Sequence, residues 1–140
     1  MEKSICIVGG LVGGTISTVF GGWGAAMTTL IIFMALDYIT GLVVAGVFNK
    51  STKIESGNLE SKAGWKGLCR KGMTLTVVLI ASRLDLMMNT TFVRDAVIIG
   101  YVVNETISII ENAGLMGLPI PTVLTKAIAV LKEKSESEGN

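Results

Sequence analysis

The chain has 140 residues, of which half are hydrophobic and only 16% are charged. A soluble domain of this length needs more charge on its surface, so the composition indicates a small integral membrane protein. The sequence contains no His, which removes the commonest general base and metal ligand, and its net charge of +1 disfavours a nucleic-acid partner. Cys6 and Cys69 are too far apart in sequence for a metal-binding motif or a disulfide framework, and no nucleotide-binding motif is present. We therefore expect no enzyme activity, no metal and no cofactor.

The first apolar region is a run of 33 uncharged residues, from Ser4 to Leu36. A single helix of that length would measure about 50 Å, whereas the hydrocarbon core of a bilayer is about 30 Å thick. The run must therefore be interrupted, and we predict two apolar helices, over about residues 5–20 and 25–48. The interruption is supplied by Gly21, Gly22 and Gly24. A cleavable signal peptide over residues 1–24 is disfavoured, because its start carries no net side-chain charge and apolar sequence continues beyond it.

Residues 49–71 differ from the apolar segments on either side. They contain six basic side chains against two acidic ones, a net charge of +4, with glycines and serines between them. This composition predicts a solvated loop, and short basic loops of membrane proteins stay in the cytoplasm. The residues expected to form the basic surface include Lys62, Lys66, Arg70 and Lys71.

Two further segments, over about residues 72–91 and 96–113, are long enough to span a membrane but are more polar. A short amphipathic helix is expected at about 121–132, followed by a disordered tail over 132–140. The predicted fold class is an all-α integral membrane protein, with one membrane domain (1–131) of three to four transmembrane helices. Four spans would place both termini in the cytoplasm, whereas three would place the N-terminus outside.

The small residues of the first segment form two rows with a spacing of four. Residues four apart share one helix face, and glycine there lets two helix backbones approach closely within lipid. This pattern favours a self-association surface and a homo-oligomer; the alternative is a merely flexible, glycine-rich segment. The residues assigned to oligomer packing are Gly9, Gly10, Gly13 and Gly14, together with Gly41 in the second segment.

Asp37 is the single charged residue of the second segment and lies near its middle. A carboxylate at that depth costs a few kcal/mol to insert, so it should face protein or water. We expect a role in helix pairing or in lining a lumen, on a face kept small by Gly41. The alternative is a solvated residue at the membrane boundary.

The third and fourth segments also carry polar residues. Arg83 and Asp85 are two positions apart, so they lie on different sides of a helix and do not pair locally. Glu105 is the expected partner of Arg83, and Asp37 is the second choice. A polar stripe is expected along the fourth segment, formed by Asn104, Glu105, Ser108 and Glu111. A span with such a stripe lines water or lies at the membrane interface.

Four stretches of the sequence resemble motifs of a known family and follow one another in the same order as in that family: LDYITGLVVAGVFNKS, GWKGLCRKG, RLD and VVNETISIIENAGLMGLPIPTVL. Over about residues 33–131 the chain resembles the phage-lysis and toxin-secretion holin family of Gram-positive bacteria and their phages. The residues that match the motifs by position are Asp37, Asp85, Asn104, Glu105, Ser108, Glu111, Asn112, Gly117, Pro119 and Pro121. The resemblance implies a shared architecture and assigns no catalytic role to any of them.

The resemblance also implies a function. Holins accumulate in the cytoplasmic membrane of the bacterial host, oligomerise and open lesions at a set time. The lesions release an endolysin or a large toxin, with no direct contact between holin and cargo required, so the implied partners are the lipid bilayer and further copies of the chain. Two alternatives are a subunit of a small-ion channel or transporter, for which no filter motif or repeat is visible, and a non-conducting membrane scaffold that recruits a partner through its basic loop.

Overall fold

The computed structural model describes residues 1–48 and 61–138, and every regular element within these ranges is a helix. The helices are α1 (Glu2–Val19), α2 (Ala25–Gly46), α3 (Ser61–Met88), α4 (Phe92–Leu115) and α5 (Thr122–Glu138). The expectation of an all-α chain is therefore confirmed for the described residues.

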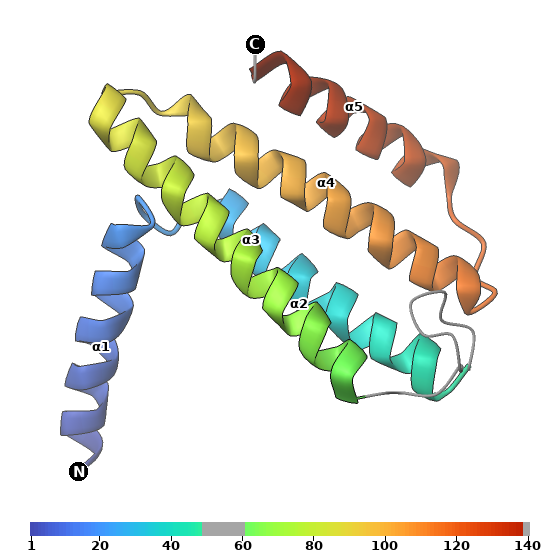
Figure 1. Cartoon of the computed structure of the whole chain (residues 1–140), viewed down its shortest axis with the longest axis horizontal. Coiled ribbons are helices and arrows are strands. Elements are labelled where there is room, and N and C mark those ends of the chain that lie inside the picture. Colours follow the sequence, from blue (N-terminus) through green and yellow to red (C-terminus); the bar gives the residue numbers. More distant parts are fainter. Residues whose placement is uncertain (49–60, 139–140) are drawn as a thin grey trace.

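Helices α2, α3 and α4 form a bundle in which α3 runs antiparallel to α2 and α4, and α5 folds back beside α4 (Figure 1). Helix α1 projects away from the bundle and touches it mainly near its own C-terminus. We call the end of the bundle that holds residues 20–24 and 89–91 the turn end. The opposite end, where α2 ends and α3 begins, is the loop end.

The core of the bundle is built from residues spaced three or four apart. Met27, Leu30 and Met34 of α2 are buried at this spacing, and so are Ile98 and Val102 of α4. Side chains at such intervals share one face of a helix, and burying that face against neighbouring helices holds the bundle together. Val78 of α3 completes the same buried cluster.

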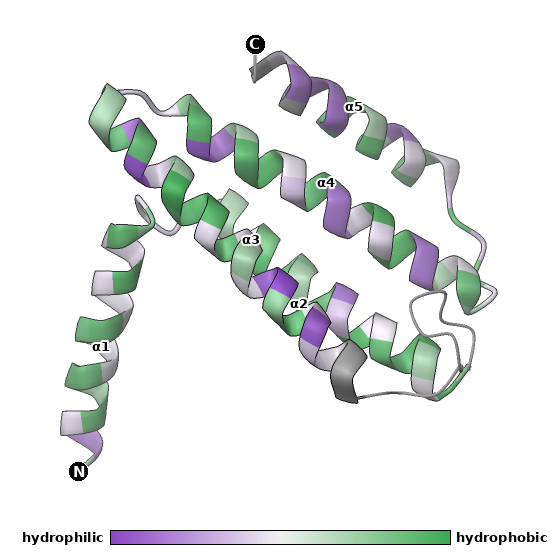
Figure 2. Ribbon diagram, in the orientation of Figure 1, coloured by the Kyte–Doolittle hydropathy of each residue, from purple (hydrophilic) through white to green (hydrophobic). Residues whose placement is uncertain are grey.

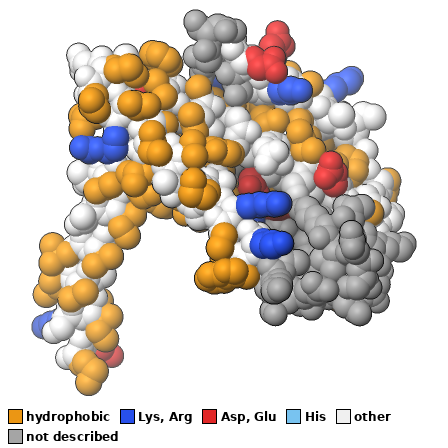
Figure 3. Space-filling view, in the orientation of Figure 1, with side chains coloured by type: hydrophobic (Ala, Val, Ile, Leu, Met, Phe, Trp, Pro, Cys, Tyr) orange, Lys and Arg blue, Asp and Glu red, His pale blue; other side chains and the backbone are white. Residues whose placement is uncertain are grey.

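The outside of the molecule is strongly apolar, whereas several polar side chains lie inside. The buried polar residues are Ser82, Asp85, Glu105 and Asn112. Large exposed apolar side chains occur on all five helices, among them Ile5, Ile32, Ile80, Phe92 and Val130. Figures 2 and 3 show hydrophobic residues over α1 and over the turn end, and Figure 2 shows hydrophilic residues on α5, along α4 and on the first turns of α3. Such an arrangement is typical of a protein whose outer surface contacts lipid.

By length and composition, one helix among the described residues could cross a membrane, and it is α2 (Ala25–Gly46). Helices α3 and α4 are long enough, but they carry more charged residues along their length. The expected number of three to four transmembrane helices therefore remains a prediction, because length and composition identify one such helix among the described residues.

The structure differs from the expected loop over residues 49–71. Residues 49–60 lie outside the described part, but α3 begins at Ser61, so Lys62, Lys66, Arg70 and Lys71 all lie on a helix. The glycines that suggest a loop serve packing instead. A Cβ atom at Gly64 would lie 3.4 Å from the Tyr38 hydroxyl, and one at Gly67 would lie 3.8 Å from the Tyr38 ring. The missing side chains let α3 pack closely on α2.

The C-terminal segment also differs from expectation. Composition predicts a disordered tail over residues 132–140, but α5 continues to Glu138, and residues 139–140 lie outside the described part. Lys132 and Glu136 are four positions apart, a spacing at which opposite charges support a helix. The run of Lys and Glu residues is also rich in good helix formers, which explains the extension.

Candidate functional site

The most distinctive feature of the bundle is a buried group of charges contributed by its three helices. The Lys71 ammonium of α3 lies 2.8 Å from Asp37 Oδ2 of α2 and 2.8 Å from Glu105 Oε2 of α4. The three side chains are only 8–15% exposed. One ammonium therefore links all three helices of the bundle through charge-assisted hydrogen bonds.

Two uncharged residues complete this group. The Asn112 side-chain amide of α4 donates a hydrogen bond of 2.9 Å to Thr40 Oγ1, and it lies 3.4 Å from both Asp37 Oδ1 and the Asp37 carbonyl oxygen. We call Asp37, Thr40, Lys71, Glu105 and Asn112 the charge cluster. Its formal charge is −1, because two carboxylates share one ammonium.

The spacing of buried residues explains why the charge cluster forms. Asp37 follows Met34 by three residues and precedes Gly41 by four, so it continues the buried face of α2. A Cβ at Gly41 would lie 3.8 Å from the Asn112 amide nitrogen. The small residue thus lets α4 approach α2. Gly41, which the sequence pattern assigns to contacts between copies, packs within one chain.

The expected pairing of Arg83 with Glu105 is not observed, because Lys71 occupies that position. Arg83 lies twelve residues further along α3, which corresponds to about 18 Å along a helix. Arg83 is exposed at the turn end.

Asp85 lies at the turn end too, where it caps α4. Its carboxylate accepts hydrogen bonds from the Thr90 hydroxyl at 2.6 Å and from the backbone N–H groups of Val93 and Arg94 at 3.1 and 2.8 Å. These are the second and third residues of α4, whose N–H groups have no partner within the helix. Asp85 therefore fixes the turn between α3 and α4.

The remaining predicted residues are not gathered into one site. On α4, Glu105 is buried and Ser108 is half-buried, but Asn104 and Glu111 are exposed, so the expected stripe divides between two faces. Lys66 and Arg70 are exposed, and nothing is described of the Lys62 side chain. A Cβ at Gly9, Gly10, Gly13 or Gly14 would meet no atom within 4 Å, and α1 has no buried residue.

Sequence reasoning places Lys71 in the basic loop and so misses its central position. A signal is nevertheless present. Lys71, Val78 and Asp85 follow one another at steps of seven, which keeps them on one helix face. Val78 and Asp85 are buried. Extending that pattern backwards from Asp85 would place Lys71 inside the bundle.

The charge cluster has a structural role, because its ion pairs link three helices inside the bundle. Within the described residues, no group of three or more His, Cys, Asp or Glu side chains is arranged to hold a metal ion. The two carboxylates face an ammonium rather than a nucleophile or a substrate cavity. The arrangement stabilises contacts among three helices, and it depends on every partner being present.

Comparison with known proteins identifies the family. The model of the bacteriophage holin family matches residues 14–133, so the match extends into α1. An uncharacterized protein of Clostridium perfringens is 38% identical over 135 residues, 94% of each chain, and one of Halalkalibacterium halodurans is 37% identical over 123 residues, 84% of this chain and 85% of the relative. A probable holin of Bacillus phage phi105 is 29% identical over 110 residues, 78% of this chain and 76% of that protein. No solved structure gives a significant match. The chain thus belongs to the bacteriophage holin family.

Proposed function

We propose that this protein is a holin that resides in the cytoplasmic membrane of a bacterial host, self-assembles there and opens lesions. The observation that carries the proposal is the inverted polarity of the bundle in a chain of the holin family. Lys71, Asp37 and Glu105 are paired inside, while large apolar side chains cover the outside. Ionisable groups within membrane segments pair with one another and face the bundle interior, as they do here.

In this proposal α2, α3 and α4 span the membrane, and α1 is the fourth span or an associated helix. Lys66 and Arg70 lie on the part of α3 nearest the loop end, so the positive-inside tendency places that end in the cytoplasm. The turn end then lies outside, and α5 begins on the cytoplasmic side, where α4 ends. Asp37 is twelve residues from the start of α2, about 18 Å along the helix, which places the charge cluster in the cytoplasmic half of the bilayer.

The charge cluster gives the holin a closed state and a means of opening. In the single chain the Lys71 ammonium is bonded to both carboxylates, so these groups have protein partners in place of water. The wall of a lesion must be polar, because water fills it. Asp37, Lys71, Glu105 and Asn112 are the groups that can supply such a wall once the helices separate. Opening therefore breaks the ion pairs of Lys71 and exchanges them for contacts with water.

Helix α1 is the element proposed to join copies of the chain. It has no buried residue, and its glycine rows meet no atom of the same chain. The hydroxyls of Thr15 and Thr18 bond to the backbone carbonyls of Leu11 and Gly14, so they demand no further partner when the helix is buried. A second copy of α1 can pack against these rows at close range.

Induced expression in bacteria, with and without a co-expressed cell-wall hydrolase that lacks a secretion signal, tests the proposal. A holin admits a membrane-impermeant dye at a defined time and causes lysis only when the hydrolase is present. Ion leakage without hydrolase release would identify a small-ion channel instead. Intact barrier function at a normal membrane level of the protein would contradict both and favour a scaffold.

A further inference from the structure

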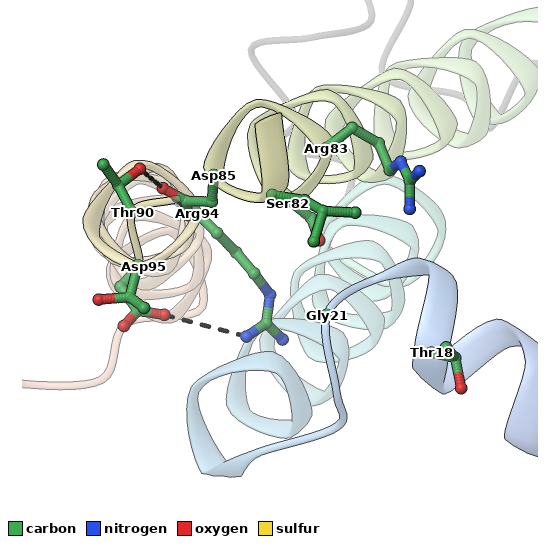
Figure 4. Close-up of a pocket in the computed structure, with 10 residues that line it drawn as sticks. Thr18, Gly21, Ser82, Arg83, Asp85, Thr90, Arg94 and Asp95 are labelled. Atoms are coloured by element: carbon green, nitrogen blue, oxygen red, sulfur yellow. Dashed lines mark hydrogen bonds and ion pairs between the residues drawn. The ribbon is translucent and has the colours of Figure 1, made fainter. Parts of the chain in front are cut away.

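A cavity of about 280 Å³ lies at the turn end, remote from the charge cluster (Figure 4). It opens between α3, the start of α4 and the turn that joins α1 to α2. Two guanidinium groups, those of Arg83 and Arg94, line it. The hydroxyl-bearing residues of its lining are Thr18, Ser82, Thr90 and Thr91.

Most charged groups of this cavity are already engaged. Asp85 accepts three hydrogen bonds from the start of α4 and Thr90. Arg94 donates from Nη2 to the Gly22 carbonyl at 2.6 Å, and its Nη1 lies 3.9 Å from Asp95 Oδ1. Arg83 is different, because it is exposed and pairs with no acidic side chain in the part of the chain that the structure describes. The two arginines and two aspartates of the lining give it no formal net charge, and Arg83 is the one of its two guanidinium groups that has no acidic partner among the described residues.

The surface around Arg83 is apolar. Figure 3 shows apolar side chains gathered over the turn end with a basic group among them. The exposed apolar residues at this end are Trp23, Leu84, Leu86, Met87, Met88 and Phe92. Aromatic rings and apolar side chains around a cation mark the level where acyl chains meet headgroups, and Arg at that level extends toward the headgroups. The surroundings of Arg83 thus point to lipid.

We propose that this cavity binds the phosphodiester of an anionic membrane lipid, with the Arg83 guanidinium as its principal contact. A guanidinium presents paired donors that match phosphate oxygens. The acyl chains of the lipid lie along the apolar surface that includes Leu86. The bound lipid holds the turn end at the headgroup level and so fixes the point from which α1 extends. The inference rests on the membrane placement in the proposed function.

The test measures lipid retention by the full chain purified in detergent, using native mass spectrometry during titration with dioleoyl phosphatidylglycerol. We expect one tightly retained lipid in the unmodified chain and about tenfold weaker retention in Arg83→Gln, because a charge-assisted contact is lost. Arg83→Lys should be intermediate, since it keeps the charge but loses the paired donors. Arg70→Gln is the matched control, because it removes an exposed arginine of the same helix at the loop end, and it should retain the lipid.

Equal lipid retention by the unmodified chain and Arg83→Gln would overturn the inference. Inorganic phosphate that displaces the lipid at equal concentration would also overturn it, since the site would then recognise free phosphate. Dioleoyl phosphatidylcholine retained as tightly as phosphatidylglycerol would remove the requirement for an anionic lipid. Lipid binding is read without lysis, so Arg83-dependent retention supports the inference even if the hydrolase-release assay fails, and that failure would count against the proposed function alone.

Discussion

Lys71 bonds to side chains of both other helices of the bundle. Its ammonium is within 2.8 Å of carboxylates on two other helices, and its surroundings are largely closed to water. Removing one partner from a buried group of charges leaves the others uncompensated, whereas replacing all of them with neutral groups often costs little. Loss of one member should therefore weaken the whole charge cluster, which agrees with the opening step of the proposed function.

We expect Lys71→Met to destabilise the bundle by about 3 kcal/mol, because Asp37 and Glu105 would then face each other without a cation. If the charge cluster holds the closed state, this variant should cause lysis earlier than the unmodified chain. The measurements are thermal unfolding in detergent and lysis time after induction at matched membrane levels.

Two variants control that experiment. Lys66→Met removes the same charge from the exposed side of α3, so it should leave lysis time unchanged. Asp37→Asn leaves one ammonium with one carboxylate, a neutral pair, and should shift the timing less than Lys71→Met. A lysis time in Lys71→Met equal to that of Lys66→Met would show that the charge cluster does not govern opening.

Gly21 is a second residue whose identity the structure explains. Its φ is +80°, and a Cβ there would lie 2.7 Å from Ser82 Oγ. We expect Gly21→Ala to destabilise the chain by about 1–2 kcal/mol, through the cost of the left-handed conformation and the steric conflict. Gly24→Ala is the matched control, because Gly24 has a φ of −88° and an added Cβ there would meet no atom within 4 Å. Equal melting temperatures of the two variants would contradict this account of the turn.

Among the helices, α1 stands apart because its surface makes little contact with its own chain. We expect Gly14→Leu to leave the fold of the single chain intact, since the new side chain meets nothing there. Crosslinking in membranes should nevertheless yield severalfold fewer oligomers, because a branched side chain separates two packed helices. Val12→Leu, on the opposite face of α1, should crosslink like the unmodified chain, and the same result for Gly14→Leu would remove α1 from the oligomer contact.

For the molecule as a whole, the proposal fixes which end faces the cytoplasm. Cys69 is exposed near the loop end, so in a Cys6→Ser background an impermeant thiol reagent should not label it in intact cells before lysis. Permeabilised cells should be labelled and serve as the positive control. Labelling of Cys69 from outside would reverse the proposed orientation. In the converse Cys69→Ser chain, labelling of Cys6 in intact cells would place the N-terminus outside and leave three spans.

Local sequence is sufficient to predict the helical class, the interruption at Gly21 and Gly22, and the membership of the holin family. These follow from the distribution of apolar residues, the conformational freedom of glycine and a specific order of motifs. Local sequence also points to Asp37 as a carboxylate that needs protein or water around it. Each of these inferences requires only neighbouring residues along the chain.

Which charges meet is settled by the packing of the helices. Sequence reasoning pairs Glu105 with Arg83 and assigns Lys71 to a solvated loop, because glycines and basic residues together resemble one. In the folded chain, Gly64 and Gly67 leave room for Tyr38 to pack against α3. Helix α3 already begins at Ser61, and Lys71 lies on its side that faces the bundle. Pairing between residues 34 positions apart depends on how far each helix extends and on its rotation against its neighbours, and those are set by packing rather than by local sequence.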